Sequence, residues 1–129
     1  MREIKDQIER LYELQLKNLQ YSPWIKKTSL PDRIEELDKE VEEVLLEAKL
    51  ESAQSLKEGL GDVLLDCLGI IVKAQDLGYC TVQEILDAAY DKFTQRKPFL
   101  LENCPVTELE EKKLWQEAKQ KEKGIKHEY

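Results

Sequence analysis

Apolar side chains in the first part of the chain recur at the three- and four-residue intervals of amphipathic helices. One such helix is predicted over residues 3–20, and its apolar stripe consists of Ile4, Ile8, Leu11, Tyr12, Leu16 and Leu19. A loop with two prolines follows. A second helix is predicted over residues 32–50, with Asp32 as its N-cap. The apolar face of this helix consists of Leu37, Val41, Val44, Leu45 and Ala48.

The third predicted helix, over residues 53–77, differs from the first two because its middle is apolar on nearly every side. A helix of this kind is expected to be the most buried element of the fold. Gly78 is well suited to end it, since glycine accepts the left-handed conformation common at helix C-termini. One small bundle does not easily cover so much apolar surface, and we therefore expect a homo-oligomer, either a homodimer or a homotetramer.

Two further helices are predicted in the last third of the chain. Thr81 is placed to cap the first of them, and Pro98 ends it. Thr107 is placed to cap the second, which ends near Lys123. No segment alternates with the period of a strand. The sequence therefore predicts an all-α fold, a helical bundle of about five helices that forms a single domain over residues 1–129.

Composition and charge narrow the class of partners. The 129 residues include 20 Lys+Arg and 27 Asp+Glu, for a net charge of −7. Without a basic stripe, duplex nucleic acid is not an expected partner. The chain starts with charged residues rather than a secretory signal, and its longest apolar stretch is too short to span a membrane. Together with three cysteines that lack metal-type spacing, these features predict a cytoplasmic protein.

Acidic residues form the most informative pattern in the chain. A row of glutamates runs beside the apolar face of the second helix, namely Glu36, Glu40, Glu43 and Glu47. Glu40 and Glu43 are three residues apart and share one side of the helix, where both can bind Mg²⁺. A solvated helix face is the alternative interpretation of these two residues.

A second set of acids lies in the third helix. Asp62 and Asp66 interrupt the apolar stretch one turn apart, and Glu58 extends the same broad face. If the second and third helices pack antiparallel, five carboxylates converge. They are Glu40, Glu43, Glu58, Asp62 and Asp66. So many like charges are stable together only beside cations, which favours a metal site over the alternative, a polar stripe at a helix edge.

Several cations and one aromatic side chain are suited to bind a nucleotide, the cations at its phosphates and the aromatic ring at its base. Lys92 and Arg96, near the end of the fourth helix, suit anionic phosphates, although such a pair also stabilises a helix C-terminus. Further lysines that can add to this charge are Lys26, Lys27 and Lys97. Trp24 is suited either to stack on a base or to pack on the bundle. Acids and cations together favour metal-assisted hydrolysis of a phosphoanhydride.

Four segments in this order carry a family resemblance. They are Ser22-Pro23-Trp24-x-Lys26, Glu40-Val41-Glu42-Glu43-Val44, Gly61-Asp62-Val63-Leu64 and Lys92-x-x-x-Arg96-Lys97-Pro98. Their order and spacing resemble the MazG family of all-α nucleoside triphosphate pyrophosphohydrolases. The segment from Trp115 to Lys119 is similar to the terminal helix of that family, so the resemblance covers about residues 8–123.

The resemblance implies a helical dimer or larger assembly with a magnesium-dependent activity, for which Mn²⁺ is a plausible substitute. The implied reaction cleaves a nucleoside triphosphate between its α- and β-phosphates, giving a monophosphate and pyrophosphate. Metal ligands implied by the resemblance are Glu40, Glu43 and Asp62. Residues implied to hold the nucleotide are Trp24, Lys26, Lys92 and Arg96.

The chain departs from the family pattern at two positions. The acidic helix of the family usually begins with two glutamates, and Lys39 occupies the first of these places. In the segment that matches the family pattern Glu-x-x-Asp, this chain has Gly59 in place of the glutamate, and the nearest acid is Glu58. A shift of one residue turns the carboxylate by about 100° around the helix axis. Either Glu58 reaches the metal through a local distortion, or Asp66 substitutes.

Glu43 or Glu58 is the predicted residue that orients or deprotonates the attacking water. Three alternatives stay open at this point. A relative within the same all-α superfamily would act on dCTP, dUTP or phosphoribosyl-ATP. A non-catalytic helical module with a degenerate metal site would bind nucleotides or a protein without turnover, and a plain helical scaffold would do neither.

Overall fold

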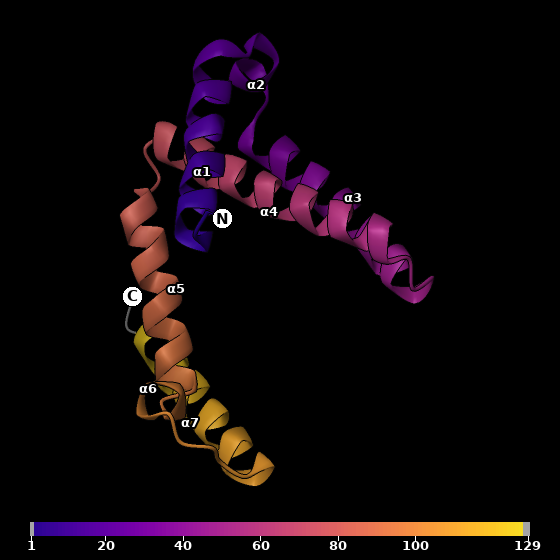
Figure 1. The fold of residues 1–129 in the computed structure, drawn as a ribbon. Helices are drawn as coiled ribbons and strands as arrows, with labels where there is room; N and C mark the ends of the chain where they lie inside the picture. Colours follow the sequence, from indigo (N-terminus) through magenta and orange to yellow (C-terminus); the bar gives the residue numbers. More distant parts are fainter. Residues whose placement is uncertain (1, 128–129) are drawn as a thin grey trace. The chain divides into compact units, whose positions relative to one another are not determined.

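A computed structural model describes residues 2–127, with side chains as far as residue 124. The described residues contain seven helices and no strand, which confirms the all-α prediction (Figure 1). In chain order the helices are α1 (Ile4–Tyr21), α2 (Pro23–Lys27), α3 (Leu30–Lys49), α4 (Ala53–Asp76), α5 (Val82–Arg96), α6 (Phe99–Glu102) and α7 (Glu108–His127). The five long helices are those predicted. Of the two short ones, α2 lies in the segment predicted as a loop, and α6 lies between the last two predicted helices.

The helix ends follow local side-chain chemistry. Ser29, not Asp32 as predicted, caps α3, because its Oγ accepts a hydrogen bond from the backbone N–H of Asp32 at 3.2 Å. Pro31 then falls in the first turn, where no amide hydrogen is needed. The predicted cap at Thr107 is confirmed by a 3.2 Å hydrogen bond from the Glu110 N–H. Gly78, with φ of 83°, follows α4 as expected.

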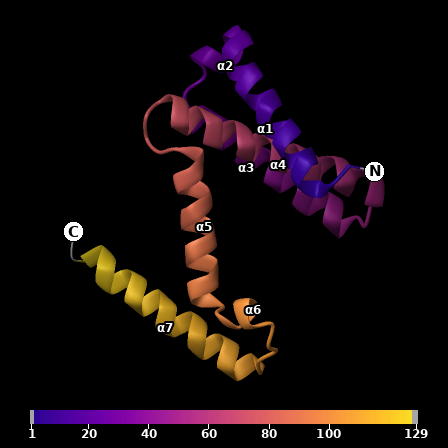
Figure 2. The ribbon, with the colours of Figure 1, turned by 60° about the vertical axis from the view of Figure 1, so that its left-hand side comes forward.

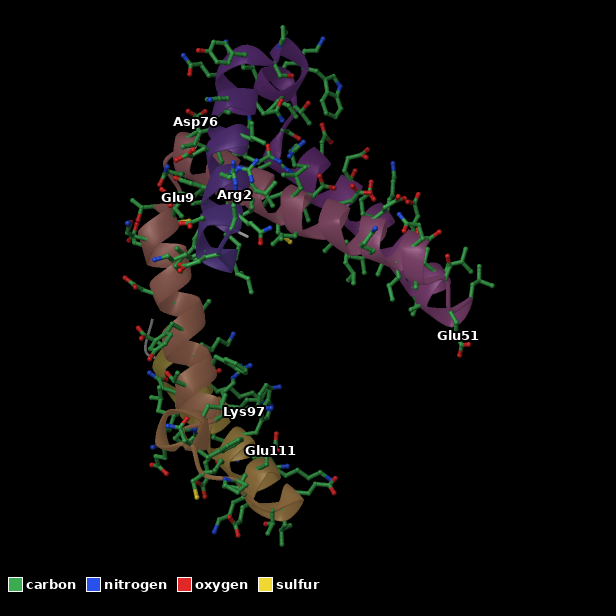
Figure 3. The ribbon with its side chains drawn as sticks, in the orientation of Figure 1. Arg2, Glu9, Glu51, Asp76, Lys97 and Glu111 are labelled. Atoms are coloured by element: carbon green, nitrogen blue, oxygen red, sulfur yellow. The ribbon has the colours of Figure 1, made fainter. Side chains whose placement is uncertain are left out.

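Contacts between Cα atoms divide the chain into two compact units, the first reaching Val82 and the second starting at Gln83. The prediction of a single domain stays a prediction. In the first unit α3 and α4 form an antiparallel hairpin, and α1 packs against α4 (Figure 2). Glu51, with φ of 56°, lies in the tight turn at the tip of this hairpin (Figure 3). The hairpin therefore brings the two acidic segments side by side.

The core of the first unit contains three long polar side chains beside its apolar ones. Gln15 Nε2 of α1 donates to the Leu65 carbonyl oxygen of α4 at 2.8 Å. Lys73 Nζ of α4 donates to two carbonyl oxygens of α2, those of Ile25 at 3.3 Å and Lys26 at 3.1 Å. The third is the buried Arg33. Because buried donors are stable only with acceptors, these bonds fix α1 and α2 against α4.

The apolar surface of α4 is only partly covered within one chain. Val72 is the most fully buried side chain, but Leu60 is 53% exposed and Leu64 is 43% exposed. The helix thus contributes most of the buried residues of the first unit while leaving part of its apolar surface open. Whether a second chain covers this surface stays a prediction.

The second unit consists of α5, α6 and α7. Arg96 at the end of α5 is tied to Glu122 of α7 by two hydrogen bonds, from Nε at 3.1 Å and from Nη2 at 2.8 Å. Its guanidinium also lies 4.7 Å from the ring centre of Trp115. Neither in this unit nor elsewhere in residues 2–127 is a helix both long enough and apolar enough to cross a membrane.

Candidate active site

Packing of α3 against α4 produces an acidic face on the first unit. The carboxylates of this face are Glu36, Glu40, Glu43, Asp62 and Asp66. The half-buried Glu40 lies at its centre. Burial raises the pKa of Glu40, and the negative charges of the other four carboxylates raise it further. The structure therefore brings together four of the five predicted metal ligands. They are Glu40 and the three predicted ligands whose charges act on it, Glu43, Asp62 and Asp66.

Asp66 differs from the rest of the acidic face because a cation lies near it. Burial raises the pKa of Asp66, while the charge of Arg33 lowers it and the charges of Asp62 and Glu36 raise it again. Arg33 is only 8% exposed. Asp66 is thus partly compensated within the chain, unlike Glu40.

Glu58, the fifth predicted ligand, lies apart from the acidic face. Its side chain is exposed, and its Oε1 accepts a hydrogen bond from Gln54 Nε2 at 2.8 Å. It is not among the carboxylates that raise the pKa of Glu40 or Asp66. No distortion of α4 turns Glu58 toward those residues, since the helix is continuous from Ala53 to Asp76.

Glu47 extends the acidic row of α3 beyond Glu43, and it faces Gly59 of α4. A Cβ atom added to Gly59 would overlap Glu47 Oε2 and lie 2.8 Å from Val44 Cγ2. Glu47 Oε2 is buried and has no hydrogen-bond partner among the described residues. The carboxylate of Glu47 therefore occupies the space that a side chain at position 59 would need.

Trp24 lies at the edge of a hollow of about 420 Å³ in the first unit, beside the acidic face. The hollow is lined by Trp24, Lys27, Thr28, Asp32, Glu35 and Glu36. Trp24 lies in the first turn of α2, whose start is capped by Ser22 Oγ accepting from the Ile25 N–H at 3.2 Å, and its side chain is exposed. Lys26, the predicted neighbour of the nucleotide, lines a different hollow of about 540 Å³ with Lys73 and Asp76. Lys27 is thus the lysine that shares a hollow with Trp24.

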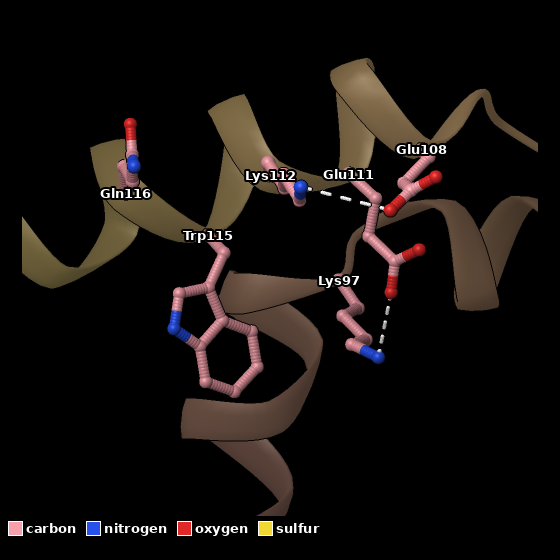
Figure 4. A pocket seen from close by; sticks show the side chains of 6 residues that line it. All are labelled: Lys97, Glu108, Glu111, Lys112, Trp115 and Gln116. Atoms are coloured by element: carbon pink, nitrogen blue, oxygen red, sulfur yellow. Dashed lines mark ion pairs between the residues drawn. The ribbon is translucent and has the colours of Figure 1, made fainter.

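The predicted phosphate-binding residues in α5 and just after it belong to the second unit. Lys92 is exposed, whereas Arg96 is held by Glu122, which raises its pKa. Lys97 forms a 2.9 Å ion pair with Glu111 and lines a cavity of about 360 Å³ beside Trp115 (Figure 4). Of the three cations, Lys92 alone has no ion pair among those that the described residues make.

Comparison with known proteins identifies the scaffold that carries these residues. Residues 29–101, more than half of the chain, match the family described as the MazG nucleotide pyrophosphohydrolase domain. The chain belongs to the MazG family. A mazG-related protein from Thermotoga maritima, known from its crystal structure, is 30% identical with a TM-score of 0.82. That alignment covers 87% of this chain and 98% of the Thermotoga chain. A search of curated proteins gave no significant match.

The residues of this MazG chain fit a divalent cation. Carboxylate oxygens are the ligands that Mg²⁺ prefers, and the acidic face offers them without a compensating cation at Glu40. The buried, unpartnered Glu47 Oε2 adds a further oxygen beside Gly59. Among the described residues no three such side chains are already gathered at coordinating distance. The carboxylates would therefore have to close around the cation when it binds.

Two features of this MazG site were not predicted from the sequence. Arg33 gave no signal, because a single arginine near a helix start is usually exposed and its burial depends on Gly69 of α4. Glu47 gave a partial signal, since it continues the acidic row, but its contact with Gly59 joins two helices and cannot be seen in either one alone.

Proposed function

We propose that this protein is a magnesium-dependent nucleoside triphosphate pyrophosphohydrolase that cleaves between the α- and β-phosphates, giving a nucleoside monophosphate and pyrophosphate. The observation that supports it most is the acidic face, on which neighbouring carboxylates raise the pKa of Glu40 within a MazG domain. Such uncompensated charge is what a cation and a polyphosphate would together neutralise.

Glu40, Glu43 and Asp62 would hold Mg²⁺, with Mn²⁺ as a substitute. When bound, the ion supplies a Lewis acid that offsets triphosphate charge and makes water more acidic. Glu43 is exposed and accepts the proton of the attacking water in this proposal, in preference to Glu58, which is bonded to Gln54. A base would stack on the exposed ring of Trp24.

Lys92 is the proposed phosphate contact of α5, because it is exposed and forms no ion pair with an acid of the described residues. Arg96 and Lys97 would contribute by exchanging Glu122 and Glu111 for phosphate oxygens. The Lys97–Glu111 pair is the more exposed of the two and is the easier to open, whereas Arg96 is mostly buried and makes two hydrogen bonds to Glu122.

Product analysis tests the reaction directly. Incubation with Mg²⁺ and a panel of nucleoside triphosphates should yield monophosphate and pyrophosphate on ion-exchange chromatography. Glu40→Gln should reduce turnover at least about 100-fold, since it removes a charged ligand of the metal. Glu42→Gln is the matched control, because Glu42 is exposed on the opposite side of α3. Release of diphosphate and phosphate, or full activity of Glu40→Gln, would contradict the proposal.

A non-catalytic nucleotide-binding module is the second candidate, and Gly59 favours it because a carboxylate of the family pattern is absent there. Calorimetry with a non-hydrolysable triphosphate and Mg²⁺ separates the two. Binding by a protein that gives no product would identify the module, whereas product formation excludes it.

We also propose that the protein is a homo-oligomer, a homodimer or homotetramer. Partly exposed leucines on α4 support this, since a second chain would remove their apolar surface from water. Light scattering at micromolar concentration should give at least twice the mass of 15.1 kDa. A mass of one chain would contradict it.

A further inference from the structure

Glu47 is an acidic residue of α3 that has no role in the proposed mechanism. It lies on α3 after Glu40 and Glu43, at the spacing that keeps residues on one helix face. The α3–α4 hairpin is antiparallel, so the acidic face continues from Asp66 and Asp62 toward Gly59 on α4. Glu47 therefore lies one helical turn beyond Glu43 and faces Gly59 of α4, next to the carboxylates that act on Glu40 and Asp66 but not among them.

The contact between Glu47 and Gly59 is specific to glycine. A Cβ atom at position 59 would overlap Glu47 Oε2, so any other residue there would force the carboxylate away. Burying a carboxylate oxygen without a hydrogen-bond partner is costly, by about 1–3 kcal/mol or more for a charged group. Oε2 of Glu47 is shielded from water and has no donor among the described residues, and a bound cation would compensate its charge.

We propose that Glu47 is a ligand of the catalytic divalent cation and takes the place of the carboxylate absent from position 59. This inference rests on the proposed function. The two alternative acids are engaged elsewhere, since Glu58 accepts from Gln54 and Asp66 is partly compensated by Arg33. In this chain the fourth carboxylate ligand is thus Glu47 of α3 rather than a residue of α4, and Gly59 leaves the space that the Glu47 side chain occupies.

Metal binding without nucleotide tests the assignment independently of turnover. Mn²⁺ alone is titrated into the protein, and free Mn²⁺ is measured by its electron paramagnetic resonance signal, with Mg²⁺ as competitor. Glu47→Gln keeps the shape of the side chain and should weaken Mn²⁺ binding at least about 10-fold, as expected for loss of a metal ligand. Glu42→Gln, an exposed glutamate on the other side of α3, should bind Mn²⁺ within about 2-fold of the unmodified protein.

Stability separates a ligand from a residue that is needed for folding. Without metal, Glu47→Gln should unfold at a higher denaturant concentration, because it removes the charge of a half-buried carboxylate whose Oε2 has no hydrogen-bond partner among the described residues. With saturating Mn²⁺ the order should reverse, because only the unmodified protein gains the full binding free energy. Equal Mn²⁺ affinity of Glu47→Gln and the unmodified protein would overturn the inference.

Moving the carboxylate back to α4 is the sharpest version of the test. Glu47→Ala removes the side chain that would overlap a Cβ at position 59, and Gly59→Glu then introduces an acid there. The double variant should recover Mn²⁺ affinity to within about 3-fold of the unmodified protein, since one carboxylate has replaced another. A double variant that binds no better than Glu47→Ala counts against the relocation.

The two proposals fail in different ways. If the unmodified protein binds Mn²⁺ and releases pyrophosphate while Glu47→Gln binds Mn²⁺ equally well, the hydrolase proposal stands and the role of Glu47 is wrong. If the unmodified protein binds neither Mn²⁺ nor Mg²⁺, the metal-dependent function is wrong and the inference falls with it.

Discussion

Two glycines of α4 each admit a charged side chain from α3, but the charges have opposite signs. At Gly69 an added Cβ would overlap Arg33 Nη2, and at Gly59 it would overlap Glu47 Oε2. Arg33 lies near the acidic face and lowers the pKa of Asp66 against the effect of burial. Glu47 brings one more negative charge to the same helix pair, and its oxygen lacks a hydrogen-bond partner among the described residues.

The difference between the two contacts separates folding from function. Where α4 approaches Arg33, a buried cation is compensated by carboxylates of the same chain, so this end of the hairpin is stable without a ligand. Where it approaches Glu47, no cation of the described chain compensates the carboxylate. The close approach of α3 and α4 therefore stabilises the hairpin at Gly69, where Arg33 is compensated. At Gly59 it leaves the negative charge of Glu47 available for a cation.

Removing the cation should have the largest effect on stability. Arg33→Met keeps most of the buried volume but leaves Asp66 without its compensating charge, and should lower the free energy of unfolding by about 2–3 kcal/mol. Denaturant unfolding at neutral pH with a chelator measures this. Arg33→Met/Asp66→Asn should regain at least about 1 kcal/mol, because the double variant leaves no unpaired charge. Equal stability of the single and double variants would show that the two residues are not coupled.

The same substitution at the two glycines should have a smaller effect and distinguish them. Gly69→Ala crowds the buried Arg33 and should cost about 1–2 kcal/mol, even after the gain in helix propensity. Gly59→Ala should change stability by less than about 1 kcal/mol, since the half-buried Glu47 can turn toward water and the helix gains propensity.

Thermal unfolding of the two glycine variants beside the unmodified protein gives this comparison. Gly59→Ala should in addition weaken Mn²⁺ binding, whereas Gly69→Ala should not when it is folded. If Gly59→Ala proves the less stable of the two, the assignment of the structural and functional ends of the hairpin is reversed.

Apolar periodicity was sufficient to predict the long helices, but not the short helix α2 or the exact start of α3. The five long helices follow from apolar spacing and caps, and their observed bounds agree within a few residues. Helix α2 was missed because five residues are too few to show a period. Helix α3 starts before the predicted residue 32, because proline, which is common in loops, is also accepted in the first turn of a helix.

The candidate site divides in the same way. Convergence of Glu40, Glu43, Asp62 and Asp66 follows from their spacing once α3 and α4 are antiparallel. The buried polar groups do not, because Gln15 and Lys73 find their acceptors on segments distant in the sequence. Position 59 stood out in the sequence as a missing acid, but only the structure shows a carboxylate of another helix in its space.

The smallest expected effect is a pH dependence of the acidic face. Burial and neighbouring carboxylates raise the pKa of Glu40, so the folded protein takes up its proton at a higher pH than the unfolded chain does. This group therefore lowers stability as the pH rises from about 4.5 through its folded-state pKa, and the loss persists at neutral pH.

Relative to the unmodified protein in chelator, Glu40→Gln should be more stable at pH 7.5 and equally stable at pH 4. The gain should stay below about 1 kcal/mol, because Glu40 is only partly buried and water screens the repulsion. Mg²⁺ should cancel it by stabilising the unmodified protein alone. A gain of the same size at both pH values would mean that Glu40 does not experience the charge of its neighbours, and the acidic face would then lack the repulsion on which cation binding is argued.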